Sequence, residues 1–172
     1  KYKFIMFAFY KRHNNNLYNK LVEFSRNIFF YKDLGLKDNF ETRIILIFMH
    51  LAIILNISKS DNYKELTQTV FDNIFQNIEY HLRELGHGDV SVNTKMKLLS
   101  KIFYDILLKI LINEKENFTT NKHFLNQHLL SASLKKGENV EKLAKYFDSF
   151  YNFCFVLDRK IMLKGQINFK FN

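Results

Sequence analysis

Apolar side chains recur along most of the chain at steps of three and four residues, the spacing that places them on one face of an α-helix. The pattern is clearest in a run that alternates steps of four and three: Val92, Met96, Leu99, Phe103, Ile106 and Ile110. Runs of this kind predict helices over about 17–31, 38–57, 63–85, 92–112, 119–130 and 139–163. We therefore expect an all-α fold, a single irregular bundle of about six helices.

The second of these helices is the most apolar. Its stretch from Ile44 to Ile57 contains only two polar residues, His50 and Asn56. These fourteen residues rise about 21 Å as an α-helix, whereas the hydrocarbon core of a bilayer is roughly 30 Å thick. The pattern therefore predicts a central helix surrounded by the others rather than a membrane span. His50 is expected to be a core histidine bonded to a neighbour.

Polar residues and glycines predict where several helices begin and end. Asp38 opens a capping-box pattern at the start of the second helix, and Thr119 or Thr120 is suited to cap the fifth. Gly86 and Gly165 stand where left-handed C-terminal caps belong. These signals support the helix ends that the apolar spacing suggests.

Length and composition favour one helical domain. The 172 residues are enough to bury roughly 70% of the unfolded surface. The sequence has no proline and only five glycines, a poor supply of turn residues for an all-β fold. We divide the chain into a basic, aromatic N-terminal segment (1–16), a helical domain (17–165) and a short extended tail (166–172), which alternates apolar and polar residues without an obvious partner strand.

The formal net charge of +9 comes from the two ends of the chain. Residues 1–22 hold five Lys or Arg and residues 159–172 hold four, with no acidic residue in either range. Residues 23–158 contain 17 basic and 17 acidic residues and are neutral. The excess charge therefore belongs to the ends and not to the folded middle.

Aromatic residues stand among the N-terminal charges, a combination suited to the interface between lipid and water. Each Lys or Arg near an anionic membrane contributes about 1 kcal/mol. Two other interpretations stay open: the aromatics pack back onto the bundle while the lysines solubilise it, or the charge meets RNA phosphates. The candidate membrane or ribosome contacts are Lys1, Lys3, Phe7, Phe9, Lys11, Arg12, Arg159, Lys160 and Lys164.

The compartment is indicated by two features. The apolar stretch from Phe4 to Tyr10 resembles a short signal sequence, but basic residues and asparagines follow it instead of a small-residue cleavage site. Cys154 is the only cysteine, so no intrachain disulfide forms. We therefore expect no export and a reducing compartment.

No residue pattern indicates catalysis or a bound cofactor. His81 and His87 are six residues apart and His123 and His128 five, whereas metal ligands on one helix face are three or four apart. The glycines beside His87 lack the third member of a dinucleotide-binding loop. Cys154 lies on the apolar stripe of the last helix and is expected to be inert. We expect no enzyme, no metal or cofactor, and no small-molecule substrate.

Two segments carry a resemblance to a known family. The first runs from Tyr31 to Arg43 and continues to His50-Leu51, and the second runs from Leu82 to Asp89 and is followed by Phe103-Tyr104. Together they resemble the ubiquinol–cytochrome c chaperone family of mitochondria and related bacteria. The opening Leu17-Tyr18 and the closing residues 163–169 extend the likeness over nearly the whole chain.

Two positions depart from the family pattern. Lys37 stands where family members commonly have proline, and Asp105-Ile106 stands where they often have Gly-Arg. This chain therefore lacks the arginine of that motif.

The resemblance implies an all-helical fold and a non-enzymatic role in assembly of respiratory complex III. Mitochondrial relatives hold newly made cytochrome b at the inner membrane, near the ribosome exit, and work with a small partner protein. The implied location is the cytoplasmic face of the inner membrane in a bacterium, or its matrix face in a mitochondrion. The motif residues that are candidate client or partner contacts are Tyr31, Asp38, Arg43, His50, Arg83, Glu84, Asp89 and Tyr104.

The same residues have local structural interpretations. Arg43, Arg83 and Asp89 are suited to ion pairs around the loops, and His50 and Tyr104 to hydrogen bonds in the core. A different function also stays open, an RNA- or ribosome-binding module that affects translation of the client. An exposed apolar groove would favour the chaperone, whereas a continuous basic face formed by both ends would favour the RNA-binding module.

Overall fold

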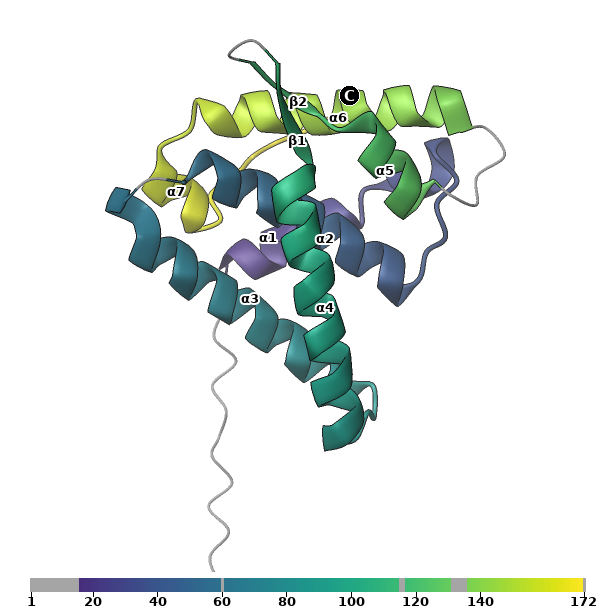
Figure 1. Ribbon diagram of the computed structural model, residues 1–172, viewed down its shortest axis with the longest axis vertical. Coiled ribbons are helices and arrows are strands. Elements are labelled where there is room, and N and C mark those ends of the chain that lie inside the picture. The colour runs from purple at the N-terminus through teal and green to yellow at the C-terminus, as the bar shows by residue number, and fades with distance from the viewer. Residues whose placement is uncertain (1–15, 60, 115–116, 131–135, 172) are drawn as a thin grey trace, which may run out of the picture.

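A computed structural model describes residues 16–59, 61–114, 117–130 and 136–171 (Figure 1). Helices dominate it, which confirms the predicted all-α fold, and the one departure is a small two-stranded sheet. In chain order the elements are α1 (Asn16–Ser25), a π-helical turn η1 (Phe29–Asp33), α2 (Phe40–Ile57), a 3-10 turn η2 (Asp61–Tyr63), α3 (Lys64–Glu84), α4 (Asp89–Lys109), β1 (Leu111–Glu114), β2 (Asn117–Thr120), α5 (Lys122–Leu129), α6 (Lys136–Phe155) and α7 (Arg159–Leu163).

Helix α2 is the centre of the bundle, as its apolar sequence predicts. It contacts α1, α4, α5 and α6, and its nine residues 46–54 are all buried, so every face of this part of the helix is covered. Among the described residues it is the one helix that is long and apolar enough to cross a membrane. A core helix passes the same test, and the surrounding helices supply the apolar environment that the sequence requires.

Helices α3 and α4 form a hairpin whose two arms diverge from the turn at residues 85–88 (Figure 1). Gly86 has φ +87°, a left-handed conformation that glycine adopts without steric cost, so its predicted capping role is confirmed. The arms pack on α2 through aromatic rings. Phe48 of α2 stacks on Phe75 at 5.5 Å between ring centroids and meets the edge of Phe103 at 5.3 Å.

The first helix is shorter than predicted because polar side chains end it. Ser25 Oγ donates to the Val22 carbonyl, and Asn27 Oδ1 accepts from the Phe29 N–H. Such local bonds compete with the helical ladder. The chain therefore leaves α1 at Ser25 and turns through η1 instead of continuing helical to residue 31.

The segment after α4 differs from the prediction. Helix was expected to residue 112, but α4 ends at Lys109 and Leu111 pairs with Thr120 in an antiparallel hairpin. Asp148 of α6 fixes this hairpin, because its Oδ1 accepts from the Thr120 backbone N–H at 2.8 Å and from its hydroxyl at 2.5 Å. The expected Thr119 or Thr120 cap is also wrong: Asn121 caps α5.

The last predicted helix is two helices. Helix α6 ends at Phe155, and α7 begins after Asp158, whose carboxylate accepts from the Ile161 N–H at 3.0 Å. The apolar stripe runs on through Leu157 and Ile161, which is why periodicity alone predicts one continuous helix. A good N-cap residue inside the stripe is the signal for the break.

The two ends of the described chain meet. Gly165 ends α7 with φ +80°, as predicted, and packs so tightly on α1 that an added Cβ would lie 2.5 Å from the backbone nitrogen of Leu17. In the tail, Ile167 is fully buried, while Phe169 and Phe171 pack against the core. Helix α1 therefore begins beside the end of α7.

Candidate binding cleft

A cleft of about 900 Å³ lies between α1, the first half of α2 and the second half of α3. Ile44 and Ile47 of α2 are buried apolar lining residues, and Ser25 at the end of α1 is buried beside them. Nearer the solvent the lining is polar and charged: Asn19, Arg26, His81 and Glu84. The cleft thus combines an aliphatic base with groups of both charges.

The periodicity of α1 and α3 explains why these side chains face the cleft. In α1, Leu17, Leu21 and Phe24 point into the core, and the cleft residues Tyr18 and Val22 follow the first two by one position each. One position on an α-helix is a rotation of about 100°. In α3 the core residues are Ile74, Ile78 and Leu82, and the cleft residues are Asn77, Tyr80, His81 and Glu84.

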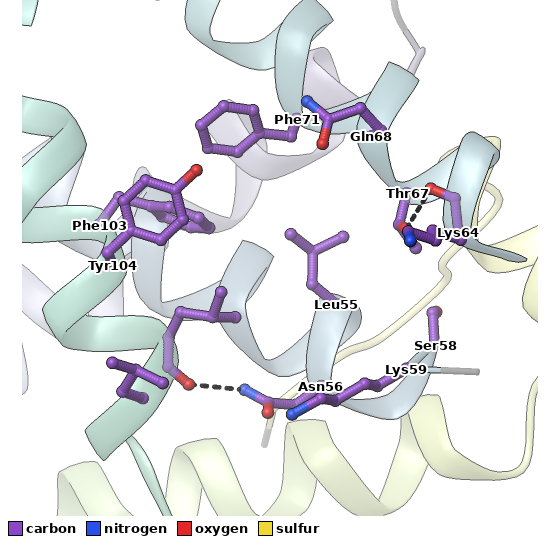
Figure 2. A pocket seen from close by; sticks show the side chains of 12 residues that line it. Leu55, Asn56, Ser58, Lys59, Lys64, Thr67, Gln68, Phe71, Phe103 and Tyr104 are labelled. Atoms are coloured by element: carbon purple, nitrogen blue, oxygen red, sulfur yellow. Dashed lines mark hydrogen bonds between the residues drawn. The ribbon is translucent and has the colours of Figure 1, made fainter. Parts of the chain in front are cut away.

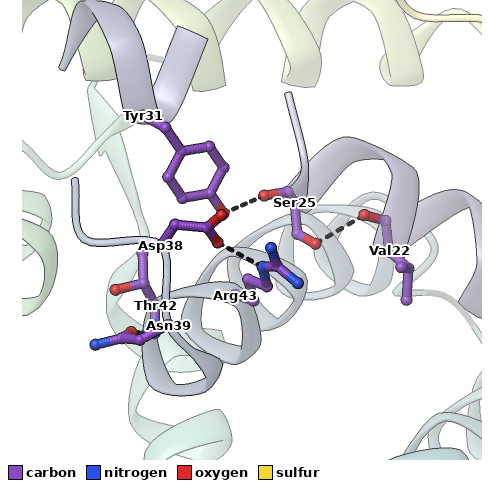
Figure 3. Close-up of polar contacts among 7 residues, drawn as sticks. All are labelled: Val22, Ser25, Tyr31, Asp38, Asn39, Thr42 and Arg43. Carbon is purple, nitrogen blue, oxygen red and sulfur yellow. Dashed lines mark hydrogen bonds and ion pairs between the residues drawn. The ribbon is translucent and has the colours of Figure 1, made fainter. Parts of the chain in front are cut away.

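Three motif residues predicted from the sequence, Tyr31, Asp38 and Arg43, meet beside the cleft, and Arg43 contributes to its lining (Figure 3). Arg43 Nε donates to Asp38 Oδ1 at 2.7 Å, and the Tyr31 hydroxyl donates to the Ser25 carbonyl at 2.5 Å. The bond to Asp38 raises the pKa of the Arg43 guanidinium. Burial, and then the Asp38 carboxylate, raise the pKa of the Tyr31 phenol. The wall therefore presents a fixed arginine cation.

Asp38 does not cap α2, which corrects the sequence prediction. Asn39 has extended backbone angles and its Oδ1 accepts from the Thr42 N–H at 2.9 Å, so Asn39 is the cap. The carboxylate of Asp38 lies one residue outside the cap and is free to pair with Arg43.

The other predicted ion pair lies at the turn between α3 and α4. Arg83 pairs with Glu79, which is partly exposed, at 2.8 Å, and with Asp89, which is largely exposed. Glu84 lines the cleft near Tyr18; burial first, and then the Glu84 carboxylate, raise the pKa of the Tyr18 phenol. The expected ion pairs are thus present as two separate groups, one in the cleft wall and one at the turn.

His50 and Tyr104 lie away from the cleft. His50 is fully buried, as predicted for a core histidine, with Nδ1 2.7 Å from the Leu46 carbonyl and Nε2 2.9 Å from the Tyr146 hydroxyl. Burial lowers the pKa of His50 to about 4. The core interpretation of Tyr104 is wrong, because this side chain is 51% exposed on α4.

Sequence reasoning missed the aromatic part of the cleft. Phe40 and His81 stack with ring centroids 5.7 Å apart and planes 9° from parallel. In the sequence, His81 stands out only through its spacing of six residues from His87, which does not suit a metal pair. The feature of the sequence that indicates this part of the cleft is a second face of α3, which carries Asn77, Tyr80 and His81.

The cleft lining combines apolar and charged side chains from α1, α2 and α3. Within residues 16–59, 61–114, 117–130 and 136–171, no three His, Cys, Asp or Glu side chains are placed to hold a metal. Cys154 is buried, and burial raises the pKa of its thiol to about 12, so it stays protonated. An amphipathic segment is the ligand that an aliphatic base with a charged opening fits.

The predicted C-terminal contacts Arg159, Lys160 and Lys164 lie on a corner formed by α6 and α7. Phe155, Val156 and Ile161 are 53%, 80% and 44% exposed there. Arg159 lies over the Phe155 ring and donates to the Phe155 and Leu157 carbonyls, while Lys160 and Lys164 are exposed. The predicted N-terminal contacts Lys1, Lys3, Phe7, Phe9, Lys11 and Arg12 lie outside the described residues.

Comparison with known proteins gives two matches. A family model described as ubiquinol-cytochrome C chaperone matches residues 32–169. The crystal structure of the Cbp3 homolog from Brucella abortus is similar in fold, with a TM-score of 0.70 and 20% sequence identity over 90% of this chain and 87% of that one. No curated protein matches the sequence. At 20% identity the structural likeness concerns the fold, and the family match stands on the sequence itself.

Proposed function

The chain belongs to the ubiquinol–cytochrome c chaperone family, and from that premise we propose that it is a non-enzymatic assembly factor that holds newly made cytochrome b during assembly of ubiquinol–cytochrome c reductase. The observation that carries the proposal is the cleft between α1, α2 and α3. It contains Arg43 and Glu84, two of the residues on which the sequence resemblance rests.

The cleft suits a short amphipathic segment of the client. Apolar side chains of such a segment would cover Ile44 and Ile47 and pack on the Phe40–His81 stack. Charged residues at its edges would meet Arg26, which is exposed at the opening. A newly made membrane protein offers apolar segments of this kind before its own helices have assembled.

The test fills the cleft with a large side chain. Asn19 is an exposed lining residue of α1, so Asn19→Trp should occupy the cleft without disturbing the core. In cells that require the chain for assembly, we expect at least a fivefold loss of cytochrome b that co-purifies with it, and a parallel loss of the cytochrome b signal in reduced-minus-oxidised spectra. Asn93→Trp, at an exposed position of α4 outside the lining of this cleft, is the matched control.

Equal cytochrome b recovery with Asn19→Trp and Asn93→Trp would remove the cleft from the mechanism. A different result would favour the alternative, an RNA- or ribosome-binding module. In that case ribosomes but no cytochrome b would co-purify with the chain, and RNase treatment would remove the ribosomes.

A second part of the proposal is peripheral contact with the membrane that receives the client. It is supported by the exposed apolar residues Phe155, Val156 and Ile161, which share the α6–α7 corner with Lys160 and Lys164. Helix α1 begins beside this corner, where Gly165 packs on the backbone of Leu17. The corner would face the cytoplasmic side of a bacterial inner membrane, or the matrix side in a mitochondrion.

Vesicle co-sedimentation tests this contact. At about 1 kcal/mol per cation, Lys160→Gln/Lys164→Gln should weaken binding to anionic vesicles by roughly 30-fold at low salt, with little effect on neutral vesicles. The control is Lys32→Gln/Lys145→Gln, which removes the same charge from exposed sites elsewhere. A chain lacking residues 1–12 measures the contribution of the N-terminal segment. If both lysine pairs act equally, net charge and not the corner determines binding.

A further inference from the structure

A second pocket, of about 640 Å³, lies between α3 and α4 toward the ends of the hairpin arms that are away from the turn (Figure 1). The end of α2 forms its base, with Leu55 at the middle. Phe103 and Tyr104 of α4 stand on one side, and Ser58 and Lys64 stand on the other (Figure 2). The volume is within the range of roughly 300–1,000 Å³ typical of small-molecule sites.

One side of this pocket is apolar and accessible. Phe71, Phe103 and Tyr104 form a cluster, with the Phe71 ring 5.4 Å from Phe103 and 5.8 Å from Tyr104 between centroids. Tyr104 is 51% exposed, and Leu108, one turn further along α4, is 77% exposed. Tyr104 and Leu108 offer a solvent-accessible surface for a flexible hydrocarbon, whereas Phe103 is fully buried beside them.

The opposite side contains a buried hydroxyl without a partner. Ser58 is 1% exposed, and its Oγ makes no hydrogen bond within the part of the chain that the structure describes. The backbone of Ser58 ends α2, since its N–H donates to the Ile54 carbonyl at 3.0 Å. The side chain points toward Lys64 (Figure 2). Buried polar groups in native proteins almost always have a partner, so an unmet hydroxyl in a pocket points to a ligand atom.

Two cations accompany this hydroxyl. Lys64 and Lys59 both line the pocket, and neither forms an ion pair with any described residue. The pocket lining contains no acidic side chain. The donors are the Ser58 hydroxyl and the ammonium groups of Lys59 and Lys64. Together they complement an anionic oxygen group.

We propose that this pocket binds an anionic amphiphile with a single acyl chain, its carboxylate or phosphate at Ser58, Lys59 and Lys64 and its chain along Leu55 and Tyr104. The polar donors and the apolar cluster lie on opposite sides of one cavity, as the two ends of such a molecule require. Each buried methylene should improve affinity roughly fourfold, because apolar burial supplies most of the binding free energy. This site is separate from the α1–α2–α3 cleft and does not depend on the proposed function.

Titration calorimetry with the intact chain tests the proposal. The probes share a twelve-carbon chain and are used below their critical micelle concentrations: laurate, lauroyl-lysophosphatidylglycerol and neutral monolaurin. We expect saturable one-to-one binding of at least one anionic probe, at least tenfold tighter than that of monolaurin. Tighter binding of laurate would identify a free fatty acid as the source, and tighter binding of the lysophospholipid would identify a membrane lipid.

Variants assign the contacts. Lys59→Gln/Lys64→Gln should weaken binding of the anionic probe by about tenfold and leave monolaurin unchanged, whereas the control Lys32→Gln/Lys145→Gln changes neither. Tyr104→Ala should weaken all probes. Ser58→Ala is the most specific variant: it should leave the melting temperature of the free protein unchanged or higher, because an unmet hydroxyl is removed, and yet weaken the anionic probe at least threefold.

Three results would overturn the proposal. The first is absence of saturable binding by both anionic probes, and the second is equal binding of monolaurin and the anionic probes. The third is binding that Lys59→Gln/Lys64→Gln leaves unchanged. None of them bears on the cleft, because the cytochrome b recovery of the Asn19→Trp experiment is measured independently.

Discussion

At the scale of single residues, the hydrogen bonds of His50 determine where its proton lies. The Leu46 carbonyl can only accept, so Nδ1 carries the hydrogen, and Nε2 of the neutral ring accepts from the Tyr146 hydroxyl. Burial is the dominant cause of its low pKa of about 4, and only the bond to the Leu46 carbonyl opposes it. The fold therefore contains a neutral histidine at the centre of its longest apolar run.

This neutral histidine should make stability depend on pH. Between pH 6.5, the usual histidine pKa, and about pH 4, the unfolded chain binds the proton and the folded chain does not. The free energy of unfolding should therefore fall as pH falls through this window, by up to about 3 kcal/mol from His50 alone. Urea unfolding at several pH values checks this. In His50→Gln, the decrease in the free energy of unfolding between pH 6.5 and about pH 4 should be smaller by the contribution of His50. His123→Gln, at an exposed site, should keep the slope of the original protein.

Gly165 is a residue whose lack of a side chain is required. Gly165→Ala introduces a left-handed alanine, at roughly 1–2 kcal/mol, and a Cβ 2.5 Å from the Leu17 backbone. Gly35 also has a positive φ, +64°, but faces open space. We expect Gly35→Ala to lower the free energy of unfolding only by the cost of the left-handed backbone. Gly165→Ala should lower it by at least about 2 kcal/mol more, as measured by chemical denaturation. Equal costs would show that α7 and α1 do not pack as described.

At the scale of elements, the start of α2 separates two neighbouring polar residues by role. Asn39→Ala removes an N-cap and should destabilise the protein by about 1 kcal/mol. Asp38→Ala removes an exposed ion pair with Arg43 and should cost less, about 0.5 kcal/mol, while leaving α2 intact. Thermal unfolding of the two variants shows which one is less stable. A larger loss of stability with Asp38→Ala would indicate that Asp38 caps α2, as the sequence predicted.

The elements themselves were largely predictable, because a stripe of apolar residues specifies a helix wherever it persists. Helices α2, α3 and α4 follow their stripes closely. The apolar stripe mispredicts the structure where a specific local or long-range hydrogen bond determines the conformation of the backbone. Asp158 caps a new helix although Leu157 and Ile161 continue the old pattern. The hairpin at residues 111–120 depends on Asp148, 28 positions further along the chain, which no local pattern reveals.

The cleft was predictable only in part. Arg43, Asp38 and Tyr31 lie close together in sequence, and their motif indicated a site. The rest of the cleft comes from α1 and α3, and its existence depends on how these helices pack on α2. The α3 face that carries Tyr80 and His81 is only a weak signal in the sequence, because a polar face on a helix usually meets only solvent.

At the scale of the whole molecule, central α2 separates three surfaces with different chemistry. The mixed cleft lies against its first half, and the pocket with Ser58 and its lysines lies at its end. The α6–α7 corner lies beside the start of α1 and carries the exposed apolar and basic residues. A client in the cleft and a membrane at the corner thus use separate parts of the surface.

The measurement that tests the central claim most directly is site-specific photo-crosslinking in cells that are assembling ubiquinol–cytochrome c reductase. A photoreactive phenylalanine analogue is placed at position 19 or 77, which line the cleft, or at position 93, which does not. The account predicts crosslinks to newly made cytochrome b from positions 19 and 77, which disappear when synthesis of cytochrome b is stopped, and none from position 93. Crosslinks of equal yield from all three positions, or to ribosomal components alone, would contradict it.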